Sequence, residues 1–186
     1  MSPRLNLPLT TEHALLGFLR QRPMHGYEIH QHLADPDGLG LVWRLKQSQL
    51  YALLAKLEHE GYVSTTLELQ DARPPRKVFQ LTPAGHDAFL AWVQSPVPHG
   101  RKLRLDFLAK LYFAQREGPA VALRLIEDQR AVCRDWLTTQ QQEAEALRGT
   151  HPYEWLVHKF RIGQIEAMLA WLDTCQEVLS AAIPHP

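Results

Sequence analysis

Three stretches of helical periodicity open the chain. Apolar residues recur three and four positions apart over residues 10–22, 25–34 and 47–60, which predicts three short amphipathic helices. Pro23 ends the first of them, and Gly61 follows the third in the position that a helix end favours. The start of the chain is therefore predicted to consist of short helices separated by turns.

A pair of strand-like segments follows the third helix. Residues 62–69 alternate weakly between apolar and polar positions, and residues 77–81 are typical of a returning strand after a turn at residues 71–76. Thr82 can cap a fourth helix, with Pro83 in its first turn. Three helices, a β-hairpin and a further helix form the order of a winged helix-turn-helix domain.

The second half of the chain carries helical patterns and no strand signal. A proline-rich polar segment at residues 95–101 marks a domain boundary, and apolar periodicity then predicts helices at 105–113, 119–147 and 153–182. We therefore expect a mainly α protein with two domains. These are a winged helix-turn-helix DNA-binding domain, residues 1–96, and a C-terminal α-helical dimerisation domain, residues 101–183.

The third helix has two chemically different faces. Its apolar stripe, spaced at i, i+3, i+4 and i+7, consists of Leu50, Leu53, Leu54 and Leu57. The opposite side and its flanks carry Ser48, Tyr51, Ala52, Ala55 and Lys56. Small alanines allow close approach to another surface, as a helix in a DNA major groove requires. The same residue types also occur on ordinary solvated helix faces, so the context must decide between the two interpretations.

The predicted hairpin tip favours the DNA interpretation. Arg73, Arg76 and Lys77 lie within five residues of one another. Such a cationic tip suits phosphate binding, because neutralising phosphates supplies most of the non-specific affinity for DNA. The positive charge is local, since the chain before Pro98 holds nine basic and nine acidic residues.

Three motifs in this half resemble PadR-type transcriptional regulators. They are PMHGYEI at 23–29, SQLYALLAKLEHEGYV at 48–63 and RKVFQLTPAG at 76–85. The second half is similar to the longer subgroup of that family, which has a virulence-activator (AphA-like) C-terminal domain. The segments LRLDFLAKLYFAQ at 103–115 and EAMLAWLD at 166–173 carry this looser likeness.

The resemblance implies a homodimeric winged-helix regulator on a palindromic operator in double-stranded DNA. It places Tyr51 at the DNA backbone and the wing in the flanking minor groove. Combined with the face of the third helix and the basic tip, it gives one predicted set of DNA-binding residues. The set is Lys46, Gln47, Ser48, Gln49, Tyr51, Ala52, Lys56, Arg73, Arg76 and Lys77.

The long helices of the second half are predicted to mediate dimerisation. The helix after Pro119 carries one coiled-coil-like seam, and the last helix carries two apolar stripes, which favours an intrachain helix and the same helix of a second subunit as its two partners. The predicted interface residues are Leu123, Ile126, Leu137, Ile162, Ile165, Leu169, Leu172 and Leu179. A self-contained bundle is the alternative, and tryptophans in these helices could instead line a ligand cavity.

Other functional classes find little support in the chain. It is 45% hydrophobic and 22% charged, with no apolar stretch that would span a bilayer and no signal-peptide pattern at its start, so we expect a cytoplasmic protein. Cys133 and Cys175 lie far apart inside helical patterns, so we expect them to be reduced thiols and not a disulfide. Neither the ten histidines nor any acid pair matches a metal or catalytic signature, so we expect no enzyme, metal or cofactor.

The sequence thus predicts a DNA-binding transcriptional regulator, more specifically a repressor that occupies its promoter. A small-molecule effector of unknown identity is left open. The alternative hypothesis is a winged-helix scaffold that binds a protein or a small ligand and has no role on DNA. The absence of net positive charge in the first half is the observation that supports this alternative.

Overall fold

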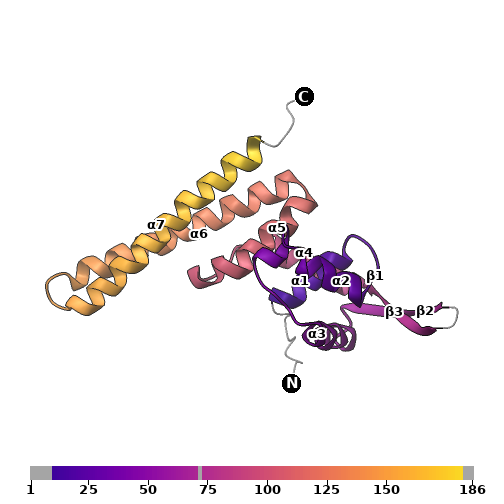
Figure 1. Ribbon diagram of the computed structural model, residues 1–186. Coiled ribbons are helices and arrows are strands. Elements are labelled where there is room, and N and C mark those ends of the chain that lie inside the picture. Colours follow the sequence, from indigo (N-terminus) through magenta and orange to yellow (C-terminus); the bar gives the residue numbers. More distant parts are fainter. Residues whose placement is uncertain (1–9, 71–72, 182–186) are drawn as a thin grey trace, which may run out of the picture. The chain divides into compact units, whose positions relative to one another are not determined.

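The computed structural model describes the backbone of residues 10–70 and 73–181 and the side chains of residues 10–69 and 75–181. The chain forms two compact units (Figure 1). Among the described residues, the first unit contains 10–70, 73–93 and Leu108–Phe113, and the second contains Gln94–Phe107 and 114–181. The boundary segment predicted at residues 95–101 therefore lies within the second unit, and the later segment Leu108–Phe113 belongs to the first unit.

The first unit has the winged helix-turn-helix order that the sequence predicts. Its elements are α1 (Thr10–Leu19), β1 (Met24–His25), α2 (Gly26–Ala34), the short 3-10 turn η1 (Leu39–Leu41), α3 (Gln47–His59), β2 (Val63–Gln70), β3 (Arg73–Leu81) and α4 (Pro83–Val93). The mainly helical fold class is confirmed. Strand β1 was not predicted, because two residues are too short to show any periodicity.

The three strands form one antiparallel sheet in the order β1-β3-β2. Val78 of β3 lies opposite Thr66 of β2 on one side and opposite His25 of β1 on the other. Because side chains alternate along a strand, residues two positions apart share a face. Glu68, two residues beyond Thr66, therefore lies on the same face of the sheet as His25.

Aromatic side chains fill the core of the first unit. Phe113, from the first part of α5 (Leu108–Glu117), is 1% exposed. It meets the ring of Phe18 edge to face at 5.2 Å between centroids and the ring of Phe89 at 5.7 Å. Trp92 of α4 completes the cluster at 6.2 Å from Phe113. Such pairs bury large apolar areas, which explains why this part of α5 belongs to the first unit.

The second unit is built on a helical hairpin of α6 (Pro119–Leu147) and α7 (Pro152–Ala181), which lie side by side (Figure 1). A π-helical turn, Leu103–Phe107, precedes α5, so the helix predicted at 105–113 in fact begins at Leu108. The side chain of Arg130 on α6 is buried and reaches Asp173 of α7 at 2.8 Å. This ion pair ties the two long helices together.

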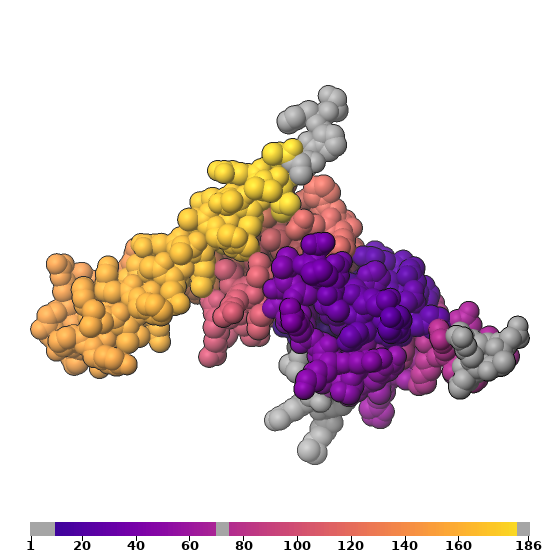
Figure 2. Space-filling model, in the orientation of Figure 1, coloured from indigo at the N-terminus to yellow at the C-terminus, as the bar shows by residue number. Residues whose placement is uncertain are grey.

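The predicted dimerisation residues divide into two groups by exposure. Ile126, Ile162, Ile165 and Leu172 are buried within the chain, and Leu123, Leu137, Leu169 and Leu179 are half-buried. More strongly exposed apolar side chains occur elsewhere on α7, at Tyr153, Leu156, Phe160 and Val178. The space-filling view shows the surface of one face of α7 (Figure 2). In the described ranges, 10–70 and 73–181, no helix is long and apolar enough to cross a membrane.

We expect Gly17→Ala to destabilise the first unit. A Cβ atom at Gly17 would lie 2.6 Å from Cε1 of Phe113, whose ring is held by its aromatic neighbours and cannot move aside. Overpacking of this kind costs about 1–3 kcal/mol of the free energy of unfolding. Urea denaturation measures it. Gly163→Ala on α7, where a Cβ would meet nothing within 4 Å, is the matched control and should stabilise by about 0.5–1 kcal/mol. Equal effects of the two variants would contradict this packing.

Candidate nucleic-acid interface

The rotation of α3 about its own axis is fixed by three leucines. Leu50, Leu54 and Leu57 are fully buried, whereas Leu53 is half-buried. Burying each leucine side chain stabilises the fold by roughly 1.5–3 kcal/mol, so turning the helix by one residue would be costly. The opposite face is consequently exposed. It carries Ser48, Tyr51, Ala52 and Ala55.

The amino end of α3 is polar and exposed. Lys46, Gln47, Ser48 and Gln49 all face solvent. The backbone N–H of Lys46 donates to Oε1 of Gln49 at 3.1 Å, a bond that closes the first turn of the helix. This bond uses the Gln49 oxygen as an acceptor and leaves its amide N–H groups, together with the side chains of Gln47 and Ser48, able to make new hydrogen bonds here.

Lys56 is tied to the protein itself. Its Nζ lies 2.6 Å from Oε1 of Glu12, a carboxylate on α1 whose side chain is 1% exposed, and 3.8 Å from Oε1 of Glu60. The hydrogen bond with Glu12 raises the pKa of Lys56 above its ordinary value. A cation that compensates a buried carboxylate has a structural role, because removing it would take away an ammonium group that neutralises a buried charge. Lys56, a member of the predicted DNA-binding set, is therefore held by carboxylates of the protein itself.

The basic residues of the wing differ in whether the protein's own carboxylates bind them. Lys77 donates to Oε2 of Glu58 on α3 at 3.0 Å, and Thr65 donates to the other oxygen of the same carboxylate. Both bonds lower the pKa of the Glu58 carboxyl, and the bond from Thr65 has the larger effect. Arg76 is exposed and lies opposite Glu68 in the strand register. The side chain of Arg73 lies outside the described residues.

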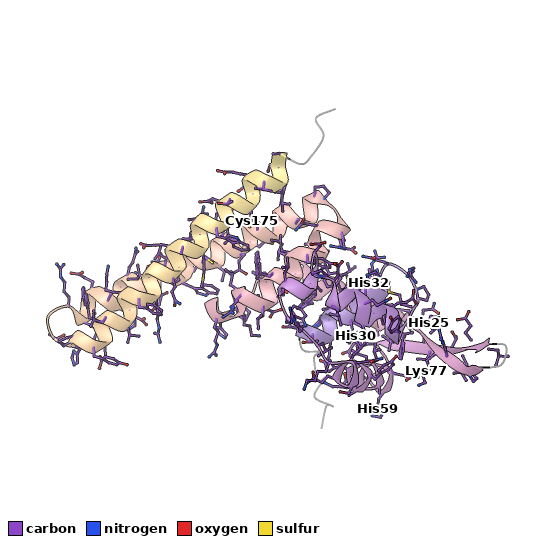
Figure 3. The ribbon with its side chains drawn as sticks, in the orientation of Figure 1. His25, His30, His32, His59, Lys77 and Cys175 are labelled. Carbon is purple, nitrogen blue, oxygen red and sulfur yellow. The ribbon has the colours of Figure 1, made fainter. Side chains whose placement is uncertain are left out.

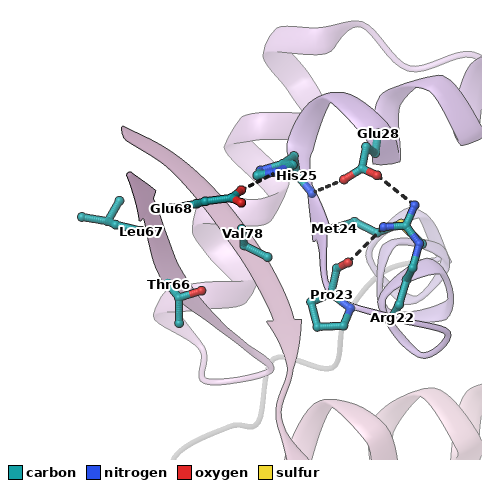
Figure 4. Close-up of a pocket in the computed structure, with 9 residues that line it drawn as sticks. All are labelled: Arg22, Pro23, Met24, His25, Glu28, Thr66, Leu67, Glu68 and Val78. Carbon is teal, nitrogen blue, oxygen red and sulfur yellow. Dashed lines mark hydrogen bonds and ion pairs between the residues drawn. The ribbon is translucent and has the colours of Figure 1, made fainter. Parts of the chain in front are cut away.

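His25 joins the wing to the helix-turn-helix (Figure 4). Its Nε2 lies 3.0 Å from Oε2 of Glu68 on β2, and its Nδ1 lies 3.2 Å from the carbonyl oxygen of Lys77 on β3. The backbone N–H of His25 donates to Oε2 of Glu28 at 2.8 Å, while Arg22 binds Oε1 of Glu28 at 2.8 Å. One residue thus contacts two wing strands and the first turn of α2.

The bonds at this joint also change the acidity of Glu28. The His25 backbone bond and then the Arg22 side chain lower the pKa of the Glu28 carboxyl. The His25 contacts to Glu68 and the Lys77 carbonyl were missed by the sequence reasoning. Only the HGYE motif marks the position, and nothing local indicates its partners.

The histidines do not assemble a metal centre in the described part of the chain. His25 lies at the wing joint near Lys77, His30 and His32 follow on α2, and His59 lies at the end of α3 (Figure 3). Among the described residues, no group of three or more His, Cys, Asp or Glu side chains is arranged to hold a metal ion. Burial raises the pKa of the Cys175 thiol to about 11, so this cysteine is a poor thiolate nucleophile.

A helix-turn-helix with an exposed second helix and a β-hairpin wing defines the class of winged-helix proteins. Residues 15–91 match the family model of the transcriptional regulator PadR-like family, and residues 103–180 match the model described as virulence activator alpha C-term. The chain belongs to the PadR-like family of transcriptional regulators and carries this C-terminal domain. Members of this family are transcriptional regulators and not enzymes.

Two relatives are similar over most of their length. The chain is 28% identical over 140 residues to the negative transcriptional regulator PadR of Bacillus subtilis, covering 75% of this chain and 72% of the relative. It is 27% identical over 183 residues to the probable transcriptional regulator Rv1176c of Mycobacterium tuberculosis, covering 90% and 96%.

The solved structures to which the chain is similar include two of the B. subtilis regulator. The complex of PadR with operator DNA has a TM-score of 0.47 at 24% identity and covers 92% of this chain and 99% of that chain. The complex with p-coumaric acid has a TM-score of 0.42 at the same identity and coverage.

We expect Glu28→Gln to reduce the dependence of the thermal unfolding midpoint on pH in the acidic range. Because the pKa of Glu28 is lower in the folded state than its ordinary value of 4.5, the folded protein gains stability above that value and loses it as the pH falls through the lower one. The variant should therefore unfold at a lower temperature than the wild type at pH 7, and the two midpoints should converge as the pH falls below 4.5. Thermal unfolding followed by circular dichroism measures this. Glu166→Gln, an exposed position on α7, is the control, and a constant difference between wild type and Glu28→Gln at every pH would contradict the assignment.

Proposed function

We propose that this protein is a homodimeric repressor that binds a palindromic operator through α3 and the wing. The exposed face of Ser48, Tyr51, Ala52 and Ala55, held outward by buried leucines, is the observation that carries the proposal. A helix with small residues at mid-face fits closely into a major groove. The B. subtilis relative is named a negative transcriptional regulator and has been crystallised with operator DNA, which supports both the partner and the sign of regulation.

The individual residues contribute to DNA binding in different ways. Gln47 and Ser48 supply hydrogen bonds at the amino end of α3, and the alanines allow the close approach. Lys46 and Arg76 are exposed cations suited to phosphates, and the same role is proposed for Arg73. Lys77 contributes less than its charge suggests, because Glu58 competes with phosphate for its ammonium group. Lys56 acts through the fold of α3.

The second copy of the chain is proposed to bind along α7. Tyr153, Leu156 and Phe160 are spaced at i, i+3 and i+7, so they form one stripe, and they are 78%, 57% and 67% exposed. Exposed apolar side chains grouped on one helix are typical of a protein interface. A two-fold axis gives an isologous dimer with two copies of α3, and a palindromic operator has two matching half-sites. The buried members of the predicted dimerisation set then serve to hold α6 against α7.

A regulator that binds chromosomal operators acts in the cytoplasm, which we propose as its location. A small-molecule effector is also part of the proposal, since the B. subtilis relative has been crystallised with p-coumaric acid.

Salt-dependent binding to DNA from the region upstream of its own gene tests this function. Fluorescence anisotropy should give a falling line of log affinity against log salt, and Arg76→Ala should flatten its slope by about 0.9 for one lost phosphate contact. Glu58→Gln should steepen the slope, because it frees Lys77 for phosphate while the amide oxygen still accepts from Thr65. Arg148→Ala, in the turn between α6 and α7, is the control and should leave the slope unchanged. No binding to any upstream fragment at low salt would refute the proposal.

We expect Phe160→Glu to convert the dimer into monomers. A carboxylate buried at an apolar interface without a partner is strongly unfavourable, so the measured mass should fall by half in light scattering coupled to size exclusion. Leu41→Glu is the control, since Leu41 is 78% exposed in the first unit and its substitution should leave the mass unchanged. A dimer that persists in Phe160→Glu and in Leu156→Glu would place the interface elsewhere.

A further inference from the structure

The ring of Tyr51 lies directly against the backbone of Gly26. A Cβ atom at Gly26 would be 2.6 Å from Cε1 of Tyr51 and 3.0 Å from both Cζ and the hydroxyl oxygen. Gly26 is buried at the first position of α2, whereas Tyr51 on α3 is 43% exposed. The tyrosine is thus covered on the side that faces α2 and open on the other.

Gly26 does not serve the backbone conformation of α2. Among the described glycines, those with positive φ are Gly61, Gly118 and Gly149, so the backbone of Gly26 would accept alanine. Alanine also has a higher helix propensity than glycine. The feature of Gly26 that this structure uses is therefore the absence of a side chain next to Tyr51.

An exposed tyrosine normally samples several rotamers, and ordering it on binding lowers affinity. Contact with the backbone at Gly26 holds the tyrosine ring in one orientation before any partner binds. We propose that Gly26 is a positioning residue that holds Tyr51 in its DNA-binding orientation. The proposal rests on the proposed function, in which Tyr51 contacts the DNA backbone.

The neighbouring residue extends the consequence to the wing. His25 binds Glu68 of β2 and the carbonyl of Lys77 in β3, at 3.0 and 3.2 Å. The dipeptide His25-Gly26 therefore holds the wing with one residue and Tyr51 with the next. Two predicted points of DNA contact, one on α3 and one on the hairpin, take their positions from the same two residues.

A double-mutant cycle on operator affinity tests the role of Gly26. The variants are Gly26→Ala, Tyr51→Ala and the two combined, in the full-length protein. The added methyl group should displace the tyrosine ring, which is the far end of a flexible side chain, and weaken operator binding about 3- to 10-fold. In the Tyr51→Ala background the same change should alter affinity by less than about twofold, because the ring it displaces is gone. The thermal unfolding midpoint of Gly26→Ala should equal or exceed that of the wild type.

Each other outcome has a distinct meaning. If Gly26→Ala weakens binding equally in both backgrounds, or not at all, Gly26 does not act through Tyr51 and the inference is overturned. If Gly26→Ala lowers the unfolding midpoint and Tyr51→Ala restores it, the contact is a packing contact and the positioning role is likewise rejected. If Tyr51→Ala alone leaves operator affinity unchanged, it is the proposed DNA contact of Tyr51 that fails.

Discussion

The buried leucine stripe of α3 is the constraint on which the proposed interface depends. Leu50, Leu54 and Leu57 have no exposed surface, so the helix can take only one rotation about its axis. Each residue turns the helix by about 100°, and a slip of one position would bury polar side chains and expose leucine. The orientation of Ser48, Tyr51 and Ala52 therefore follows from core packing and requires no DNA to be present.

Ion pairs within the protein then divide the cations between structure and binding. Lys56 compensates the buried carboxylate of Glu12, and Lys77 shares Glu58 with Thr65. Arg76 and Lys46 stay exposed and can release counterions on binding DNA. A chain with no net charge can thus still present exposed cations, because acidic residues such as Glu12 and Glu58 are paired within the protein to other lysines.

The order of elements and the two faces of α3 were predictable, because both follow from local periodicity. The partners of the charged residues were not. Glu12 and Lys56 are 44 positions apart, and nothing near either residue indicates the other. Strand β1 exists because β3 offers a free edge beside Met24 and His25, which is a tertiary effect. The contact between the Tyr51 ring and Gly26 likewise depends on the packing of α2 against α3.

Photo-crosslinking from a single position on α3 tests the central claim most directly. A cysteine-linked crosslinker at position 52 (Ala52→Cys) lies at the centre of the exposed face, while one at position 87 (Asp87→Cys) lies on α4, where the side chain is 85% exposed. The account predicts crosslinks to operator DNA from position 52 and none above background from position 87. Equal crosslinking from the two positions, or crosslinking from position 87 alone, would contradict it.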